Sequence, residues 1–250
     1  FIGGAGVMEG FLKKASICWE EGSDQVTKSY LSSALFFTGL LMSCLFLILK
    51  MAALFLDDEI AEFVYWALIL AISVIFFNLF DAYYRSCRKT IHFAVLVLSK
   101  GVVTLILGVF FLAESGAKGL LLSEILSAFI LGLLAFPIVL DFDSLLAISF
   151  KRYLELIRHG YHMVMVVMVR NISMILDKLI ITAVIGTTAV GLYSFTMILV
   201  SACLIVLGTV MSLYGPIWIG EYAKHNDSKK LIGQVNKLIL VLEALLLIGL

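Results

Sequence analysis

Seven long apolar runs, separated by short polar connections, dominate the amino-acid sequence. Each has about 20 residues, the length that a helix needs to cross about 30 Å of hydrocarbon. An open sheet would leave its backbone groups unsatisfied in lipid, so the pattern predicts an all-α polytopic membrane protein. Residues 1–14 are typical of the end of an earlier helix, which brings the expected number of helices to about eight. The apolar runs cover residues 31–52, 60–81, 90–113, 119–140, 160–185, 189–214 and 232–250.

Basic residues are concentrated in every second connection between these runs. One set of connections holds thirteen of them, whereas the other holds only Lys50 and Lys118. Cytoplasmic connections of membrane proteins carry an excess of Lys and Arg, so the first set is predicted to face the cytoplasm. Its basic residues are Lys13, Lys14, Lys28, Arg85, Arg88, Lys89, Lys151, Arg152, Arg158, Lys224, Lys229, Lys230 and Lys237.

One predicted cytoplasmic connection has the pattern of an amphipathic helix. In DFDSLLAISFKRYLELIRHG, residues 141–160, apolar residues recur at helical spacing and charged residues fall on the other side. We therefore predict an amphipathic connecting helix over 141–158 that lies on the inner membrane surface. This helix would join residues 1–140, part of a first helical lobe, to residues 159–250, part of a second. The alternative is that the stretch is a cytoplasmic extension of the next membrane-spanning helix.

The composition excludes several classes of protein. Hydrophobic residues make up 62% of the chain and charged residues 14%, whereas a soluble domain is about half apolar and a quarter charged. The formal net charge is zero, so we expect no nucleic-acid partner. No metal-binding, phosphate-binding or catalytic motif is present, so we expect no enzymatic activity, no cofactor and no metal. Because the chain begins without Met and stops inside the apolar run LILVLEALLLIGL, we expect it to be an internal fragment.

The stretch LDKLIITAVIGTTAVGLYSFTMIL, residues 176–199, resembles the seventh and eighth helices of Wzx-type polysaccharide flippases. These proteins belong to the multidrug/oligosaccharidyl-lipid/polysaccharide (MOP) exporter superfamily. Three other stretches resemble further segments of these flippases, and they occur in the same order along the chain. The segments are the second and third helices, the loop between the fourth and fifth helices, and the turn into the sixth helix. The three stretches are GVMEGFLKKASICWEEGSDQVTKSYLSSAL, DAYYRSCRKT and ESGAKGLLLSEILSAFILGLL.

This resemblance implies a function and a cellular setting. Two helical lobes would surround a central cavity that opens alternately to each side of the bacterial inner (plasma) membrane. The substrate would be undecaprenyl-pyrophosphate-linked oligosaccharide, flipped from the cytoplasmic to the outer leaflet for O-antigen, lipopolysaccharide or other surface polysaccharide biosynthesis. Besides this lipid-linked oligosaccharide and the lipid bilayer, the polysaccharide polymerase and the glycosyltransferases are the implied partners.

Some charged residues lie well within the predicted membrane spans, where each charge costs several kcal/mol. Arginine binds phosphate through two hydrogen bonds and stays protonated. We therefore predict that Arg170, near the middle of its span, contacts the substrate, with Lys100 and Lys178 as further substrate-binding cations. Carboxylates in such spans can serve in gating or in coupling to H⁺ or Na⁺. The candidates for this role are Asp177, Glu124 and Glu243.

The residues leave other interpretations open. Lys100 and Glu124 could form a purely structural ion pair between neighbouring helices, and Asp177 could pair with Lys178 or with another helix. A cation or drug antiporter of the same superfamily is an alternative function, although it would need a cluster of acids in its cavity. A membrane-embedded enzyme of envelope-glycan assembly, or a scaffold whose charges are all paired, is an alternative from another class.

Overall fold

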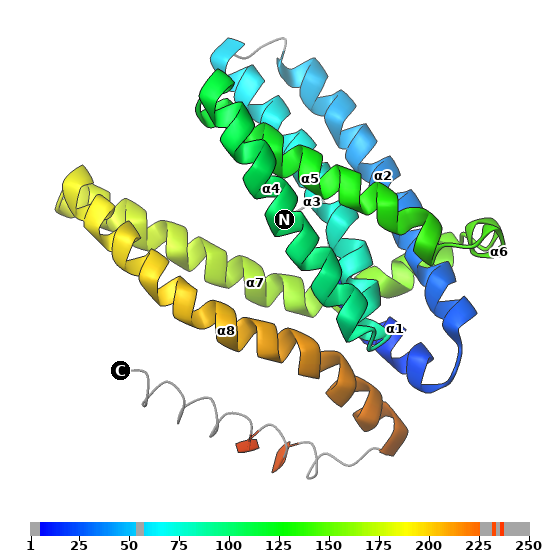
Figure 1. Cartoon of the computed structure of the whole chain (residues 1–250). Helices are drawn as coiled ribbons and strands as arrows, with labels where there is room; N and C mark the ends of the chain where they lie inside the picture. Colours follow the sequence, from blue (N-terminus) through cyan, green and yellow to red (C-terminus); the bar gives the residue numbers. More distant parts are fainter. Residues whose placement is uncertain (1–5, 54–57, 226–231, 234–235, 238–250) are drawn as a thin grey trace. The chain divides into compact units, whose positions relative to one another are not determined.

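A computed structural model describes residues 6–53, 58–225, 232–233 and 236–237 of the chain. Within these residues the chain is helical and contains no strand, which confirms the predicted all-α fold (Figure 1). The labelled helices are α1 (Val7–Glu20), α2 (Asp24–Ala53), α3 (Asp58–Ser86), α4 (Thr90–Ser115), α5 (Ala117–Val139), α6 (Phe142–Leu146), α7 (Phe150–Val184) and α8 (Thr187–His225).

Within the part of the chain that the structure describes, four helices are long and apolar enough to cross a membrane. Their candidate spans are Asp24–Met51, Ala61–Ser86, Thr90–Ser115 and Lys118–Val139, which correspond to the first four predicted runs. Helices α7 and α8 contain the predicted runs 160–185 and 189–214 almost completely. Most of the last run, 232–250, lies outside the described residues.

The chain divides into two compact units, residues 1–164 and 165–250, and each is considered by itself. The first unit contains α1 to α6 and the first part of α7. Its core lies where α1, α2, α3, α5 and the start of α7 pack together, and its largest fully buried side chains include Phe11, Leu31, Phe80, Tyr83 and Leu156. The predicted division at 141–158 remains a prediction.

The predicted connecting helix is interrupted in the structure. The short helix α6 ends at Leu146, and α7 begins at Phe150 and continues to Val184. The break is stabilised by two contacts, because Arg152 Nη1 donates to the Ala147 carbonyl at 2.7 Å and the Ser149 N–H donates to Ser33 Oγ at 3.0 Å. The structure therefore divides the predicted helix over 141–158 in two, and residues 150–158 continue into the next long helix. The position of this segment on the inner membrane surface stays a prediction.

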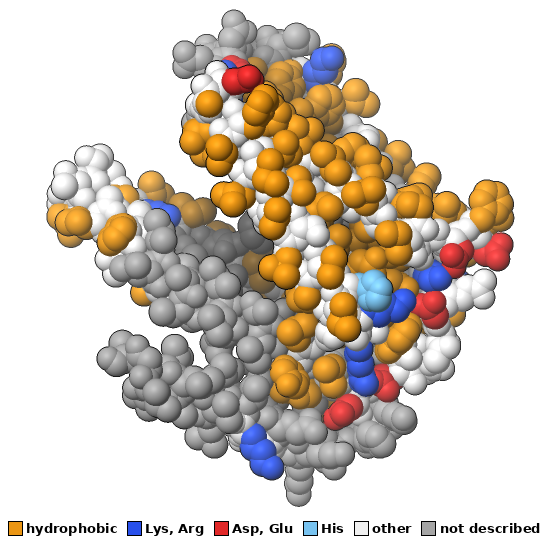
Figure 2. Space-filling view, viewed as in Figure 1, with side chains coloured by type: hydrophobic (Ala, Val, Ile, Leu, Met, Phe, Trp, Pro, Cys, Tyr) orange, Lys and Arg blue, Asp and Glu red, His pale blue; other side chains and the backbone are white. Residues whose placement is uncertain are grey.

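Helix α4 packs mainly on α5 and leaves much of its surface open. Most of its large apolar side chains are exposed, and Figure 2 shows apolar side chains covering this face of the first unit. Ile106 and Phe110 are examples, each with about 60% of its surface accessible (62% and 60%). Such a surface suits hydrocarbon rather than water, so we expect this face of the unit to contact lipid.

Candidate functional site

Two predicted site residues, Lys100 of α4 and Glu124 of α5, meet inside the membrane-spanning part of the first unit. Lys100 Nζ forms an ion pair with Glu124 Oε1. Thr104 Oγ1 lies 2.6 Å from Ser127 Oγ and donates to Glu124 Oε2 at 3.5 Å. The Lys100 ammonium also lies 5.1 Å from the centre of the Phe77 ring of α3. We call Lys100, Thr104, Glu124 and Ser127 the intramembrane cluster.

Local helix geometry explains how the cluster forms. Thr104 follows Lys100 by four residues and Ser127 follows Glu124 by three, so each pair shares a helix face. Gly108 and Ser123 are small residues at the same contact, and a Cβ on Gly108 would lie 3.5 Å from Ser123 Oγ. Small side chains let α4 and α5 approach closely in a membrane. The pair and its hydroxyl neighbours therefore give each charge a partner where lipid would give none.

A second ion pair, absent from the predicted site, lies within α3. Arg85 Nη2 and Asp81 Oδ2 are 2.7 Å apart, and the Asp81 side chain is buried. The Arg85 guanidinium is 5.9 Å from the Phe93 ring centre, and its Nε finds no hydrogen-bond partner within the described residues. Their i, i+4 spacing could have shown this pair, but the charge pattern indicated Arg85 only as one of the basic residues predicted to face the cytoplasm.

The other predicted site residues lie on α7 or beyond it. Arg170 is part of α7, but its side chain is not among those that the structure describes. Asp177 and Lys178 are exposed in the second unit, and neither forms an ion pair with another described side chain. The predicted pairing of Asp177 with Lys178 is therefore not observed. Glu243, the last predicted site residue, lies outside the described residues. The substrate, gating and coupling roles of these residues stay predictions.

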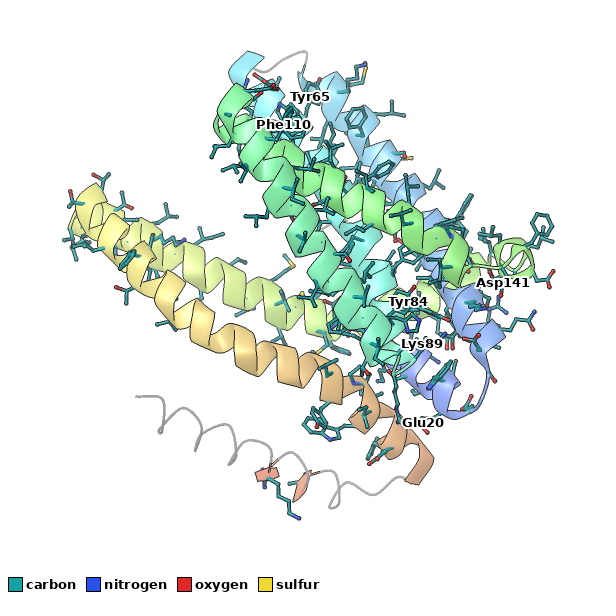
Figure 3. All side chains as sticks on the ribbon, in the orientation of Figure 1. Glu20, Tyr65, Tyr84, Lys89, Phe110 and Asp141 are labelled. Atoms are coloured by element: carbon teal, nitrogen blue, oxygen red, sulfur yellow. The ribbon has the colours of Figure 1, made fainter. Side chains whose placement is uncertain are left out.

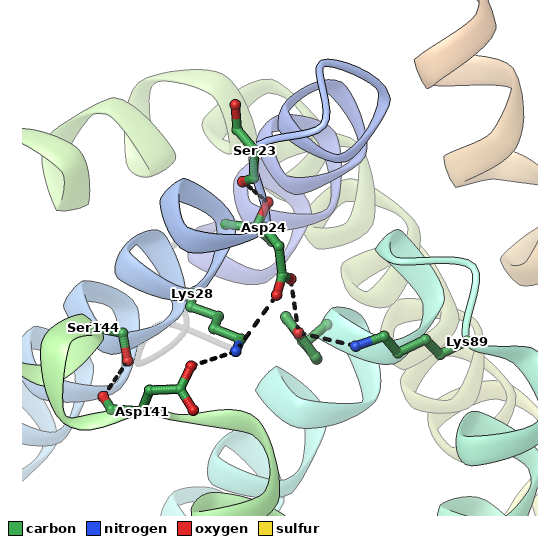
Figure 4. A network of polar contacts seen from close by, with 8 residues as sticks. Ser23, Asp24, Lys28, Lys89, Asp141 and Ser144 are labelled. Atoms are coloured by element: carbon green, nitrogen blue, oxygen red, sulfur yellow. Dashed lines mark hydrogen bonds and ion pairs between the residues drawn. The ribbon is translucent and has the colours of Figure 1, made fainter.

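A polar network at the end that is predicted to be cytoplasmic connects α2, α3 and the residue before α6 (Figure 4). Lys28 Nζ contacts Asp141 Oδ2 at 2.5 Å and Asp24 Oδ2 at 3.4 Å. Tyr83 donates its hydroxyl hydrogen to Asp24 Oδ1 at 3.1 Å, and Lys89 Nζ donates to the Tyr83 oxygen at 3.4 Å. Asp141 and Lys89 lie at the end of the first unit opposite to Tyr65 and Phe110 (Figure 3). No local pattern in the sequence indicated this network.

A neighbouring set of contacts holds the start of α7 against the first unit. Glu155 forms an ion pair with Lys14 of α1 and accepts a hydrogen bond of 2.6 Å from the Tyr30 hydroxyl of α2. The hydrogen bond from Lys14, followed by that from Tyr30, lowers the pKa of the Glu155 carboxyl. At neutral pH Glu155 is therefore a stable anionic partner for both elements.

Two cavities among the described residues of the first unit have different linings. A polar one of about 500 Å³ lies beside the cytoplasmic network and is lined by Asp24, Lys28, Asp141 and their neighbours. An apolar one of about 550 Å³ lies among α2, α3 and α5, with Phe46, Ile69 and Phe129 in its wall. No group of three or more His, Cys, Asp or Glu residues within the described ranges could hold a metal ion.

Cys87 is expected to resist thiol reagents in the folded protein. Its side chain is 2% exposed, and burial raises the pKa of its thiol to about 12. Since the thiolate is the reactive form, very little of it is present at pH 7.5. A single-cysteine variant that retains Cys87 should therefore react with a water-soluble maleimide only after denaturation. The matched control is a single cysteine at the exposed position of Lys13, and equal labelling rates in the native state would contradict the prediction.

The chain matches one known family over nearly its whole length. The description "Polysaccharide biosynthesis protein" applies to that family, and the match covers residues 8–247. Comparison with curated proteins and with solved structures gave no match. The match includes all of α2 to α8, and so both the intramembrane cluster and the predicted charges of α7.

Proposed function

The chain belongs to the polysaccharide biosynthesis protein family, and we propose that it is a transporter rather than an enzyme. It is a multi-pass membrane protein of polysaccharide biosynthesis. In our proposal it flips undecaprenyl-pyrophosphate-linked oligosaccharide from the cytoplasmic to the outer leaflet of a bacterial inner membrane by alternating access, as a flippase of the MOP superfamily. The product would serve O-antigen or similar polymers, with the polymerase and glycosyltransferases acting beside it.

The observation that carries this proposal is the intramembrane cluster in a protein of this family. A charged pair with two hydroxyl partners lies between two apolar helices, although charged residues in membrane spans are costly and usually mark a route for polar substrates or ions. Carrying a pyrophosphate through hydrocarbon requires cationic partners, and these partners must release it again. A paired cation meets both needs, because Lys100 can exchange Glu124 for a phosphate oxygen and then return to Glu124.

The remaining predicted residues take their roles in the same cycle. Arg170 would bind the pyrophosphate through its planar guanidinium, and Lys178 would receive it nearer the outer surface. Asp177 would act in gating, and Glu124 and Glu243 are the candidates for coupling to H⁺ or Na⁺. The proposal requires no bound cofactor, since the work is translocation without bond cleavage.

The test is a lipid-linked glycan translocation assay on the full-length protein in proteoliposomes. Arg170→Ala is expected to lower the initial flipping rate at least tenfold, and Arg170→Lys is expected to keep part of it, because lysine retains the charge but loses the two-pronged geometry. The neighbouring Ile172→Ala, at an exposed apolar position, is the control. Wild-type rates in Arg170→Ala at matched expression would remove Arg170 from the mechanism. Absence of flipping by the wild-type protein for any lipid-linked glycan would contradict the proposed function itself.

A further inference from the structure

The segment that contains α6 and the first turns of α7 exposes large apolar side chains outside the four candidate spans. Phe142 is 75% exposed and Leu146 72% exposed, and Phe150 and Leu154 are also exposed. Figure 2 shows apolar and acidic side chains together where α6 lies in Figure 1. A cluster of this kind on a segment surrounded by water would be unfavourable, and it indicates a binding surface.

Three contacts place this segment alongside α2 instead of out in the cytoplasm. Asp141 binds Lys28, the Ser149 N–H binds Ser33 Oγ, and the Phe150 ring lies 5.2 Å from that of Phe37. The three partners follow one another along α2 over nine residues, which corresponds to about 13 Å of helix. From Asp141 to Phe150 the chain therefore runs along α2 toward the centre of its membrane span.

The exposed apolar surface of the segment continues the lipid-facing surface of its neighbours. On α2, Phe36 and Leu40 are exposed next to the contact at Phe37. On α5, Leu134 and Ile138 are exposed in the last turns before Asp141. Since both helices are membrane spans, the apolar surface of α6 lies at the edge of a surface that already contacts lipid.

The charges of the segment fit the boundary between headgroups and acyl chains. Asp141 is neutralised by Lys28, and Asp143 lies in the first turn of α6, at the Lys28 end of the segment. Lys151 and Arg158 are exposed on α7, next to Phe150 and one turn after Leu154. Their long side chains can reach lipid phosphates while their stems stay in an apolar layer.

We propose that α6 and the first turns of α7 form an anchor that is immersed in the cytoplasmic leaflet. Phe142, Leu146 and Phe150 lie among the acyl chains, and Lys151 and Arg158 bind the phosphates of the lipid headgroups. The anchor holds the chain between α5 and α7 at a defined depth, whatever substrate the protein carries. It is therefore independent of the proposed flipping activity and concerns bulk lipid only.

The test measures the surroundings of α6 in nanodiscs of phosphatidylethanolamine and phosphatidylglycerol. A nitroxide is attached at Leu146→Cys, in a background without the native cysteines, and its collisions with oxygen and with a water-soluble nickel chelate are compared. The references are Ile106→Cys on the lipid-facing side of α4 and Lys13→Cys, an exposed cytoplasmic position. The oxygen-to-nickel collision ratio at Leu146 is expected to resemble that at Ile106.

Two results would overturn the anchor. A ratio like that at Lys13 would show that α6 is in water, and low collision with both reagents would show that a second copy or another protein covers it. If the cysteine-free protein does not fold, Leu146→Trp in the native background replaces it. Brominated lipids should then quench the added fluorescence, relative to the parent with its three tryptophans, more than acrylamide does, and the reverse order would overturn the anchor as well.

Discussion

Replacing Glu124 by Gln is expected to lower both the stability of the protein and its rate of flipping. Lys100 would lose its counter-charge inside the membrane-spanning region, where an uncompensated cation costs about 3 kcal/mol. The variant should therefore show a clearly lower thermal midpoint in detergent. The same loss is expected for Lys100→Met, because Glu124 would then lack its partner.

A double variant separates the structural role of the pair from its role in transport. Removing both charges with Lys100→Met and Glu124→Leu should restore most of the stability, since apolar residues often replace a buried ion pair without loss. Flipping should remain lost if Lys100 contacts the substrate. Wild-type flipping in a stable double variant would limit the pair to a structural role, as the alternative interpretation holds.

The control for these variants is Glu62→Gln. Glu62 pairs with Lys118 at 2.5 Å, but both side chains are more than half exposed, and such surface pairs contribute little to stability. Its thermal midpoint should stay near that of the parent. If Glu124→Gln behaves in the same way, the intramembrane cluster does not hold α4 to α5.

Adding a single methyl group at Gly10 or Gly160 is expected to destabilise the packing of α7 on α1. A Cβ on Gly10 would overlap with the Leu156 carbonyl group, and one on Gly160 would overlap with the backbone of Gly6. Backbone atoms cannot move aside as the end of a flexible side chain can, so the helices must separate. Overpacking of this kind costs about 1–3 kcal/mol, which should be visible in the thermal midpoints of Gly10→Ala and Gly160→Ala.

The control for this contact is Gly39→Ala in α2. No atom lies within 4 Å of a Cβ placed on Gly39, and alanine stabilises a helix interior by roughly 0.5–1 kcal/mol relative to glycine. Gly39→Ala should therefore match or exceed the parent in stability. Unchanged midpoints in both Gly10→Ala and Gly160→Ala would show that the close crossing of α1 and α7 does not form in the membrane.

The amino-acid sequence by itself was sufficient for the fold class and for the first four spans. A membrane requires each span to satisfy its own backbone and to be apolar over about 20 residues, and both requirements are visible in one dimension. The charged residues within the spans could also be identified from the sequence, because a charge within an apolar run is easily recognised. The resemblance to polysaccharide flippases agreed with the family match over residues 8–247.

The tertiary structure alone decided how these residues are partnered. Whether Lys100 meets Glu124 depends on the rotation and stagger of α4 against α5, and the sequence left that pair as one of two interpretations. The break between α6 and α7 depends on Ser33, which lies 116 residues from Ser149 in the chain. The hydrogen bond from Tyr30 to Glu155 joins residues that are 125 positions apart. Amphipathic periodicity cannot show such contacts, because it records which face of a helix is apolar and not which element covers that face.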